Sequence, residues 1–189
     1  MIKGLAIGFL LALVTMAGGS FLYVASGMAP VSTSDKPFPF EKKLANMALD
    51  ARIKNQHVEQ SPVVADEPNF LDGAKMYKQH CAVCHGLPNH PADLAKGMYP
   101  PPPQLFKGKG VTDDPASETY WKTANGIRMT GMPSFKDILT DTQSWQVSQL
   151  LAHADKISAT VKEVLVPDVS VSTSTPTLAP ESTHRLATK

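Results

Sequence analysis

Cys81, Cys84 and His85 form a Cys-x-x-Cys-His run, and they are the residues of this chain best suited to chemistry. Such a run is typical of a c-type haem attachment site, where two thiols add across the porphyrin vinyl groups and the adjacent His lies under the iron as its proximal ligand. Both cysteines of the chain are in the run, so none is left for a structural disulfide. The sequence therefore predicts a redox protein with one covalent haem.

Two other uses of the run are open. A Cys-x-x-Cys pair is also the reactive dithiol of thioredoxin-like proteins, but that interpretation needs a βαβ pattern around the pair, and the sequence has none. A zinc site is the second alternative, although a His directly beside a ligand Cys fits zinc spacing poorly. Its four ligands would be Cys81, Cys84, His85 and His90.

Met132 is the candidate for the sixth coordination position of the iron. It lies between Gly and Pro, well beyond His85 in the chain. The Gly lets the backbone come close to the porphyrin, and the Pro stiffens the turn that presents the sulfur. Met129 is the alternative sulfur, but it lacks both flanking residues. His90 or His153 would instead give bis-His ligation, although His90 follows the proximal His too closely to reach the opposite face easily.

The Cys-x-x-Cys-His start, the Pro-rich middle loop and Gly-Met-Pro before a last helix resemble the monohaem class I cytochromes c. The resemblance is greatest to bacterial, membrane-anchored members with a long Pro-rich insertion after the haem motif, and it covers about residues 69–158. It implies one haem c bound through Cys81 and Cys84, with His85 and Met132 as the axial ligands.

The resemblance also implies a role for the step Pro103-Gln104-Leu105. The carbonyl of Pro103 would accept the Nδ1–H of the proximal His, and Leu105 would lie against the porphyrin. A ligating His needs such an acceptor to fix its ring and tautomer. A merely rigid polyproline turn is the alternative. Donors for the haem propionates would be Arg128, Tyr99 and Trp121; Arg128 as a docking charge and Trp121 as a core aromatic are equal alternatives.

The N-terminus is long and apolar, and no charge lies between Lys3 and Asp35. Because about 20 apolar residues are enough to cross a bilayer as a helix, we expect a transmembrane anchor over residues 1–29. A cleaved signal peptide is the alternative, although its apolar region is normally about 7–15 residues long. Either interpretation exports the haem domain: it would be held in the periplasm by a single pass of the bacterial inner membrane, or become soluble there after cleavage.

Two segments flank the expected domain. Residues 30–68 are interrupted by prolines and are expected to be a spacer, with a short amphipathic helix that lies on lipid head groups, packs on the domain or is simply solvated. The apolar stripe of that helix consists of Phe40, Leu44, Met47 and Ala51. Residues 159–189 are expected to be a disordered tail, since a Ser/Thr/Pro-rich composition buries little apolar surface.

Three helices are expected in the domain, and no alternating strand pattern of useful length is present. The first covers about residues 69–80, the middle one about 115–125, and the last begins at Thr140, where Thr-x-x-Gln forms a capping box. Asp114 is expected to cap the middle helix. The predicted fold class is all-α: a small cytochrome c-like helical domain wrapped around a covalent haem, preceded by one N-terminal transmembrane helix.

Gly73 lies on the apolar stripe of the first helix, where it lowers helix propensity. A close crossing with another helix would explain it. We therefore expect the first and last helices to cross near Gly73, with Tyr77 and Trp145 close to the contact.

Charge gives little guidance to the partners. Residues 69–158 contain nine basic and eight acidic side chains, a net charge of +1, so strong electrostatic steering is not indicated and nothing points to nucleic acid. An iron with both axial positions filled has no open site for a substrate. We therefore expect a one-electron carrier rather than an enzyme, acting between membrane or periplasmic redox proteins or as the cytochrome subunit of an oxidoreductase complex.

Two other functions stay open at this point. In a haem enzyme or gas sensor the Met ligand would be displaced and the iron would bind a small molecule. A thiol oxidoreductase without haem would be colourless. The sequence does not indicate the oligomeric state or the electron donor and acceptor.

Overall fold

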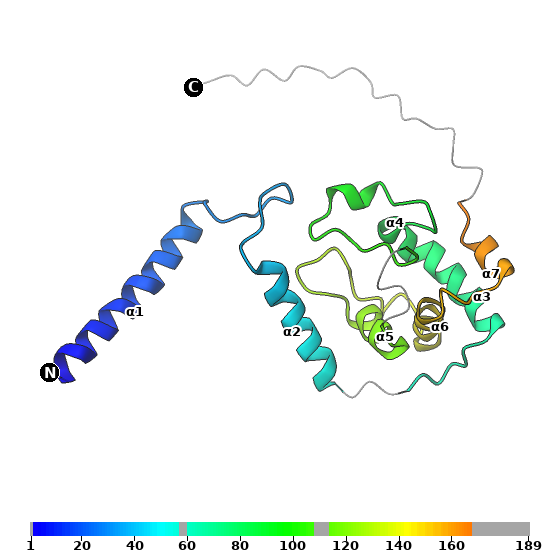
Figure 1. Ribbon diagram of the computed structural model, residues 1–189, viewed down its shortest axis with the longest axis horizontal. Helices are drawn as coiled ribbons and strands as arrows, with labels where there is room; N and C mark the ends of the chain where they lie inside the picture. Colours follow the sequence, from blue (N-terminus) through cyan, green and yellow to red (C-terminus); the bar gives the residue numbers. More distant parts are fainter. Residues whose placement is uncertain (1, 57–59, 108–113, 168–189) are drawn as a thin grey trace, which may run out of the picture.

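The computed structural model describes residues 2–56, 60–107 and 114–167. Within these residues it contains helices, turns and one isolated bridge, and no strand, which confirms the all-α prediction. Figure 1 shows the order of the elements. They are α1 (Ile2–Ala25), α2 (Glu41–Asn55), α3 (Glu67–Met76), a π-helix (Tyr77–Cys81), α4 (Ala82–His85), a 3-10 helix (Leu94–Gly97), α5 (Ala116–Asn125), α6 (Asp141–Ala152) and α7 (Ala159–Val164).

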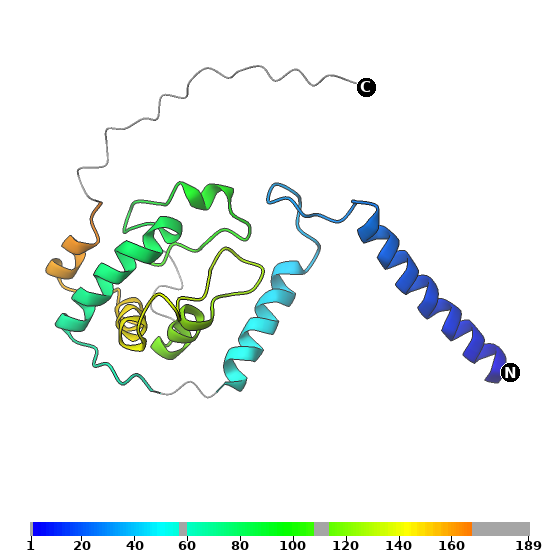
Figure 2. The ribbon, with the colours of Figure 1, turned by 180° about the vertical axis from the view of Figure 1, so that it is seen from behind.

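Helix α1 projects away from the remaining helices in both ribbon views (Figures 1 and 2). It has no buried residue and a mean hydropathy of 2.1. Among the described residues, α1 is the one helix that is long and apolar enough to cross a membrane. A signal sequence would have the same properties.

Helices α3 and α6 cross at Gly73, as expected. A Cβ added to Gly73 would lie 2.4 Å from the carbonyl oxygen of Gln146 on α6, so the two backbones are closer than any other residue type allows. Around this crossing lies the hydrophobic core. Its fully buried members include Ala74, Tyr77, Val147 and Leu150.

Helix α6 begins with the predicted capping box. The Thr140 hydroxyl accepts the N–H of Gln143 at 3.2 Å, and the Gln143 side chain accepts the N–H of Thr140 at 2.9 Å. Trp145, expected close to this crossing, is buried beside Gln146 in the chain, and its ring stacks on that of Tyr120 of α5 at 4.1 Å. The reason is its position on the helix, which turns it toward α5 while Val147 and Leu150 meet the α3 side.

Helix α5 ends at Asn125, as predicted, and Gly126 follows it as the C-cap, but the helix does not begin as predicted. Pro115 is the residue before it, and no side chain caps the helix. Asp114 instead accepts a hydrogen bond from Lys122 at 2.6 Å, and Glu118 pairs with the same ammonium at 2.8 Å. Lys122, about two helical turns further along the chain, therefore binds the carboxylate that was expected to be the cap.

The ordered helices extend beyond residue 158, where the tail was expected to begin. Ser158 caps α7, accepting the N–H of Val161 at 3.2 Å. Val161 and Leu165 then bury their side chains completely in the core beside α3. Because these two apolar side chains lie one turn apart, they bury enough surface to order this segment, whereas the residues after it are mostly polar. The rest of the predicted tail, residues 168–189, lies outside the described residues.

Helix α2 occupies the expected spacer and lies between α1 and the other helices (Figures 1 and 2). Ile53 is its one buried residue. The stripe identified in the sequence faces away from the domain: Phe40, Leu44 and Met47 are all more than half exposed.

Candidate functional site

The two cysteines and the histidine lie on one continuous helical stretch. Helix α3 passes into the π-helix that ends at Cys81, and α4 then carries Cys84 and His85. Single π-helical turns within α-helices are frequent at functional sites. The buried Tyr77 hydroxyl donates to the carbonyl of Gly86 at 2.8 Å, which ties the end of α4 back to the core. The run is thus held on a rigid element rather than on a loop.

His85 has the orientation that an axial ligand requires. Its Nδ1 lies 2.8 Å from the carbonyl oxygen of Pro103, which is the predicted hydrogen bond. The Gln104 amide donates to the carbonyl of His85 at 2.6 Å and fixes the same loop to α4. Burial lowers the pKa of His85, and the Pro103 hydrogen bond opposes that shift only in part. The lowered pKa favours the neutral imidazole, and no described residue bonds Nε2, whose lone pair can then bind a metal.

Cys81 and Cys84 are both free thiols and partly exposed. Burial raises the pKa of Cys81 to about 12, and the neighbouring Cys84 adds to the rise. A thiol that stays protonated at neutral pH is a poor nucleophile. The structure therefore disfavours Cys81 as the nucleophile of a reactive dithiol, and it places the two free cysteines one helical turn apart.

The chain turns sharply after the run. Gly86 has φ +75°, and a Cβ there would lie 2.5 Å from the carbonyl oxygen of His90, so only glycine fits. Leu87 and His90 pair across the turn, with N–H···O distances of 2.8 and 2.9 Å. This tight turn sends the chain away from His85 and leaves one side of that ring to the loop that carries Pro103.

The two histidines considered as alternative ligands are held elsewhere. Nδ1 of His90 bonds the carbonyl of Pro88 at 2.9 Å, and Nδ1 of His153 bonds the carbonyl of Gln149 at 2.9 Å. The ring of His153 also lies 5.5 Å from that of Phe70. Among the described residues no three His, Cys, Asp or Glu side chains are grouped as a metal site, so the zinc alternative finds no support.

Met132 lies in a loop whose two ends are fixed to α5. Ile127 donates its N–H to the carbonyl of Met132 at 3.1 Å and closes the loop. Gly126, at φ +68°, packs so closely on the backbone that follows Met132 that an added Cβ would lie 2.6 Å from Pro133. Met132 is partly buried, whereas Met129 is 91% exposed. Of the two sulfurs in the loop, only that of Met132 is sheltered.

Met98 is a residue of this region that the sequence analysis missed. A Cβ added to Gly131 would lie 2.1 Å from the Met98 methyl, so this side chain lies directly over the backbone beside Met132. The structure shows a close approach at Gly131 to the Met98 methyl, and the expected approach of this backbone to the porphyrin stays a prediction. The sequence signal at this residue is only the short Gly-Met-Tyr segment before the four prolines. This segment has no helical or strand periodicity that would assign Met98 to a buried face.

Two of the three predicted propionate donors contact α2. The Trp121 indole donates to the side-chain oxygen of Gln56. Tyr99 bonds the Glu41 carboxylate; partial burial, with this neighbour, raises its pKa. Arg128 is exposed.

Leu105, expected against the porphyrin, is half-buried and packs against the hydrophobic core cluster. Its neighbour Phe106 meets the Tyr77 ring edge-on at 4.9 Å. The loop after Pro103 thus contributes to the core as well as to His85.

Residues 68–151 match the family model described as cytochrome C oxidase, cbb3-type, subunit III. This part of the chain is a class I-like cytochrome c domain, and it binds haem c covalently. No curated protein and no solved structure matches the chain.

The residues present fit a haem c. Two free cysteines separated by two residues lie on a helical stretch, and the adjacent His bonds Pro103 through Nδ1 while no described residue bonds its Nε2. Cys81 and Cys84 would hold the porphyrin, and His85 would hold its iron.

Proposed function

We propose that this protein is a one-electron carrier whose haem c is bound by Cys81 and Cys84 and ligated by His85 and Met132. The observation that carries the proposal is the 2.8 Å hydrogen bond between His85 Nδ1 and the Pro103 carbonyl. That bond fixes the tautomer and directs Nε2 away from the loop, as a permanent ligand needs. A bound haem c supplies a one-electron Fe(III)/Fe(II) couple.

The residues around the site hold its geometry fixed. The Pro103 carbonyl and the Gln104 amide form hydrogen bonds with His85, and the hydrogen bond between Ile127 and Met132 closes the Met loop. A thioether is neutral and soft, so ligation by Met132 favours the reduced iron, and apolar surroundings disfavour the additional positive charge of the oxidised one. We therefore expect a positive midpoint potential.

The redox partners are proposed to be proteins of the membrane or the periplasm. The description of the matching family names a subunit of an oxidase. By that likeness the chain would serve as the cytochrome subunit of a respiratory oxidoreductase complex. Residues 1–29 would anchor it in the bacterial inner membrane by α1, with the cytochrome c domain in the periplasm, as the length and hydropathy of α1 favour.

The test is a potentiometric titration of the matured, full-length protein in detergent, together with exposure of the reduced form to carbon monoxide. The proposal predicts the sharp α and β bands of a thioether-linked haem, a positive midpoint potential and no rapid binding of carbon monoxide. A strongly negative midpoint potential, or immediate binding of the gas, would show that Met132 is not a permanent ligand.

A further inference from the structure

Helix α2 carries an apolar stripe on its outer face that no other described part of the chain covers. Phe40, Leu44 and Met47 are 73, 62 and 56% exposed. Their spacing places them on one side of the helix, with Ala51 one turn further on. Large apolar side chains grouped in this way on an exposed surface mark an interaction site.

The inner face of α2 is already in use. Ile53 is buried, Gln56 accepts the Trp121 indole N–H, and Glu41 bonds Tyr99. These contacts hold both ends of the helix against the cytochrome c domain. The helix therefore cannot rotate to bury its outer stripe without breaking them, and the stripe stays turned outward.

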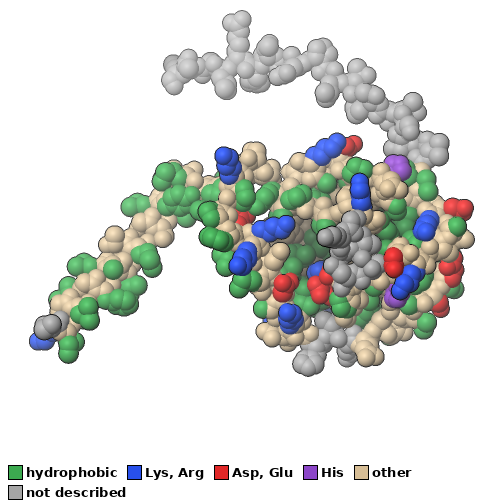
Figure 3. Space-filling model, in the orientation of Figure 1, with side chains coloured by type: hydrophobic (Ala, Val, Ile, Leu, Met, Phe, Trp, Pro, Cys, Tyr) green, Lys and Arg blue, Asp and Glu red, His purple; other side chains and the backbone are tan. Residues whose placement is uncertain are grey.

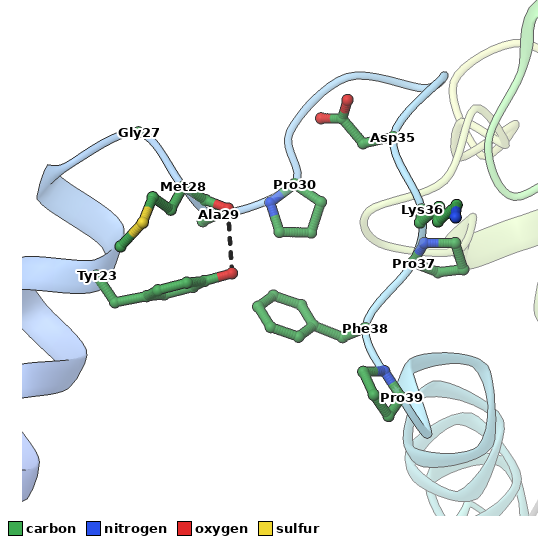
Figure 4. A pocket seen from close by; sticks show the side chains of 10 residues that line it. All are labelled: Tyr23, Gly27, Met28, Ala29, Pro30, Asp35, Lys36, Pro37, Phe38 and Pro39. Atoms are coloured by element: carbon green, nitrogen blue, oxygen red, sulfur yellow. Dashed lines mark hydrogen bonds between the residues drawn. The ribbon is translucent and has the colours of Figure 1, made fainter.

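The start of α2 is linked to the end of the membrane-spanning candidate α1. Tyr23, on the last turn of α1, has its ring 5.9 Å from that of Phe38, and its hydroxyl donates to the carbonyl of Met28 at 3.1 Å (Figure 4). A Tyr near the end of a membrane-spanning helix lies at the level of the lipid head groups. Phe38, and Phe40 two residues later, are thereby brought to the same level.

The charge of this segment suits a negatively charged surface. Residues 36–56 contain five basic and two acidic side chains, whereas the expected domain is almost neutral. Lys42 and Lys43 are exposed at the start of α2, close in the chain to Phe38 and Phe40. Figure 3 shows basic side chains beside apolar ones over α2. Cationic and apolar side chains side by side are what an interfacial helix presents to anionic lipids.

We propose that the outer face of α2 docks on an anionic bilayer, in the plane of the head groups, beside the end of α1. The stripe would enter the boundary between head groups and acyl chains by ~5–10 Å. Because the inner face is bonded to Trp121 and Tyr99, α2 fixes the cytochrome c domain at one orientation on the membrane. The segment is then a brace, and the domain does not swing freely on its anchor.

The test uses the full-length, matured protein in nanodiscs that contain anionic lipid. Its two native cysteines are occupied by thioether bonds, so a nitroxide can be placed by Leu44→Cys. Asn46→Cys is the matched control, because it is exposed on the same helix but points away from the stripe. The proposal predicts that the label at position 44 is several-fold more accessible to oxygen than to a polar nickel chelate, with the opposite preference at position 46.

Equal, water-like accessibility at both positions would overturn the proposal. Because the nanodiscs contain no redox partner, this result would also indicate that the stripe binds a protein instead of lipid. Nanodiscs of zwitterionic lipid, and the double substitution Lys42→Gln/Lys43→Gln, should each reduce the immersion of position 44. Unchanged immersion in both would overturn the anionic surface as the ligand.

A second measurement reads the orientation of the domain directly. Linear dichroism of the haem bands in oriented bilayers should be strong for the unsubstituted protein and weak for Leu44→Ser/Met47→Ser, with unchanged absorption spectrum and midpoint potential. The same dichroism in both proteins would contradict the brace. If the electron-carrier proposal is wrong, the unsubstituted protein itself will lack the expected spectrum or have a strongly negative midpoint potential. The two failures are therefore distinguishable.

Discussion

Met98 packs on the backbone of Gly131, the residue before Met132, and this contact helps to hold the Met loop. The Met98 methyl covers the Gly131 backbone, while the hydrogen bond between Ile127 and Met132 closes the loop from within. Met129 takes no part, because its side chain is 91% exposed. Because an axial ligand on a loop leaves the iron when the loop opens, the stability of the loop sets how readily the ligand is displaced.

Replacing Met98 should therefore loosen the sixth ligand without removing it. We expect Met98→Ala to raise the rate at which the reduced protein binds carbon monoxide by about tenfold, which corresponds to about 1.4 kcal/mol of lost loop stability. Stopped-flow mixing measures this rate. Met129→Ala is the control and should leave it unchanged; an equal effect of both substitutions would mean that Met98 does not support the loop.

The residues of the haem motif could be predicted because their chemistry fixes their spacing, and the acceptor Pro103 could be predicted from the resemblance to class I cytochromes c. Met98, and the contacts of Tyr99 and Trp121 with α2, could not. Those two side chains have donors suited to propionates, but their partners Glu41 and Gln56 lie far away in the sequence. Only the tertiary position of α2 brings them together.

At the scale of the elements, the crossing of α3 and α6 depends on Gly73. Alanine normally stabilises a helix interior relative to glycine by about 1 kcal/mol. Here its Cβ would lie 2.4 Å from the Gln146 carbonyl oxygen, which belongs to the backbone and cannot turn aside.

We expect Gly73→Ala to destabilise the domain by about 1–3 kcal/mol, as overpacking of a core does. Chemical denaturation followed by the haem absorbance measures the loss. Gly131→Ala is the matched control: the nearest atom there is the end of the flexible Met98 side chain, so its cost should be smaller. Stabilisation by Gly73→Ala would contradict the close crossing.

Helix α7 belongs to the folded domain, although the polar sequence after it suggested otherwise. Chains that end after Ser158 lose Val161 and Leu165 from the core, each worth about 1.5–3 kcal/mol when fully buried. Chains that end after Pro167 keep both. Thermal unfolding should show a large loss of stability for the shorter chain and almost none for the longer one. Equal stability would return the boundary to residue 158.

Local signals explain which elements were predicted. The capping box at Thr140 and the stop at Gly126 involve neighbouring residues, so the sequence contains them in full. Asp114 was misassigned because Lys122 competes for its carboxylate. Helix α7 is short, and its signal, Ser158 followed by Val161 and Leu165, becomes convincing only when the core that receives these side chains is known.

At the scale of the whole molecule, the described residues form an apolar helix, the amphipathic helix α2 and a cytochrome c domain. Because α1 has no buried residue, nothing in the described chain covers its apolar side chains, and a bilayer would. Retention of α1 therefore decides whether the domain works at the membrane.

We expect the mature protein to keep α1 and to stay in the membrane fraction after washing with alkaline carbonate. Mass spectrometry of the purified protein should find peptides from residues 2–25. A mature N-terminus close after Ala25, with the haem in the soluble fraction, would show that the segment is a cleaved signal.

The most direct test of the account is to identify the sulfur on the iron. In the reduced, diamagnetic protein with labelled methionine methyl groups, NMR should find one methyl resonance shifted far upfield by the porphyrin ring current. This resonance should disappear in Met132→Leu and persist in Met98→Leu and Met129→Leu. Absence of any such resonance, or its loss in Met98→Leu instead, would contradict ligation by Met132.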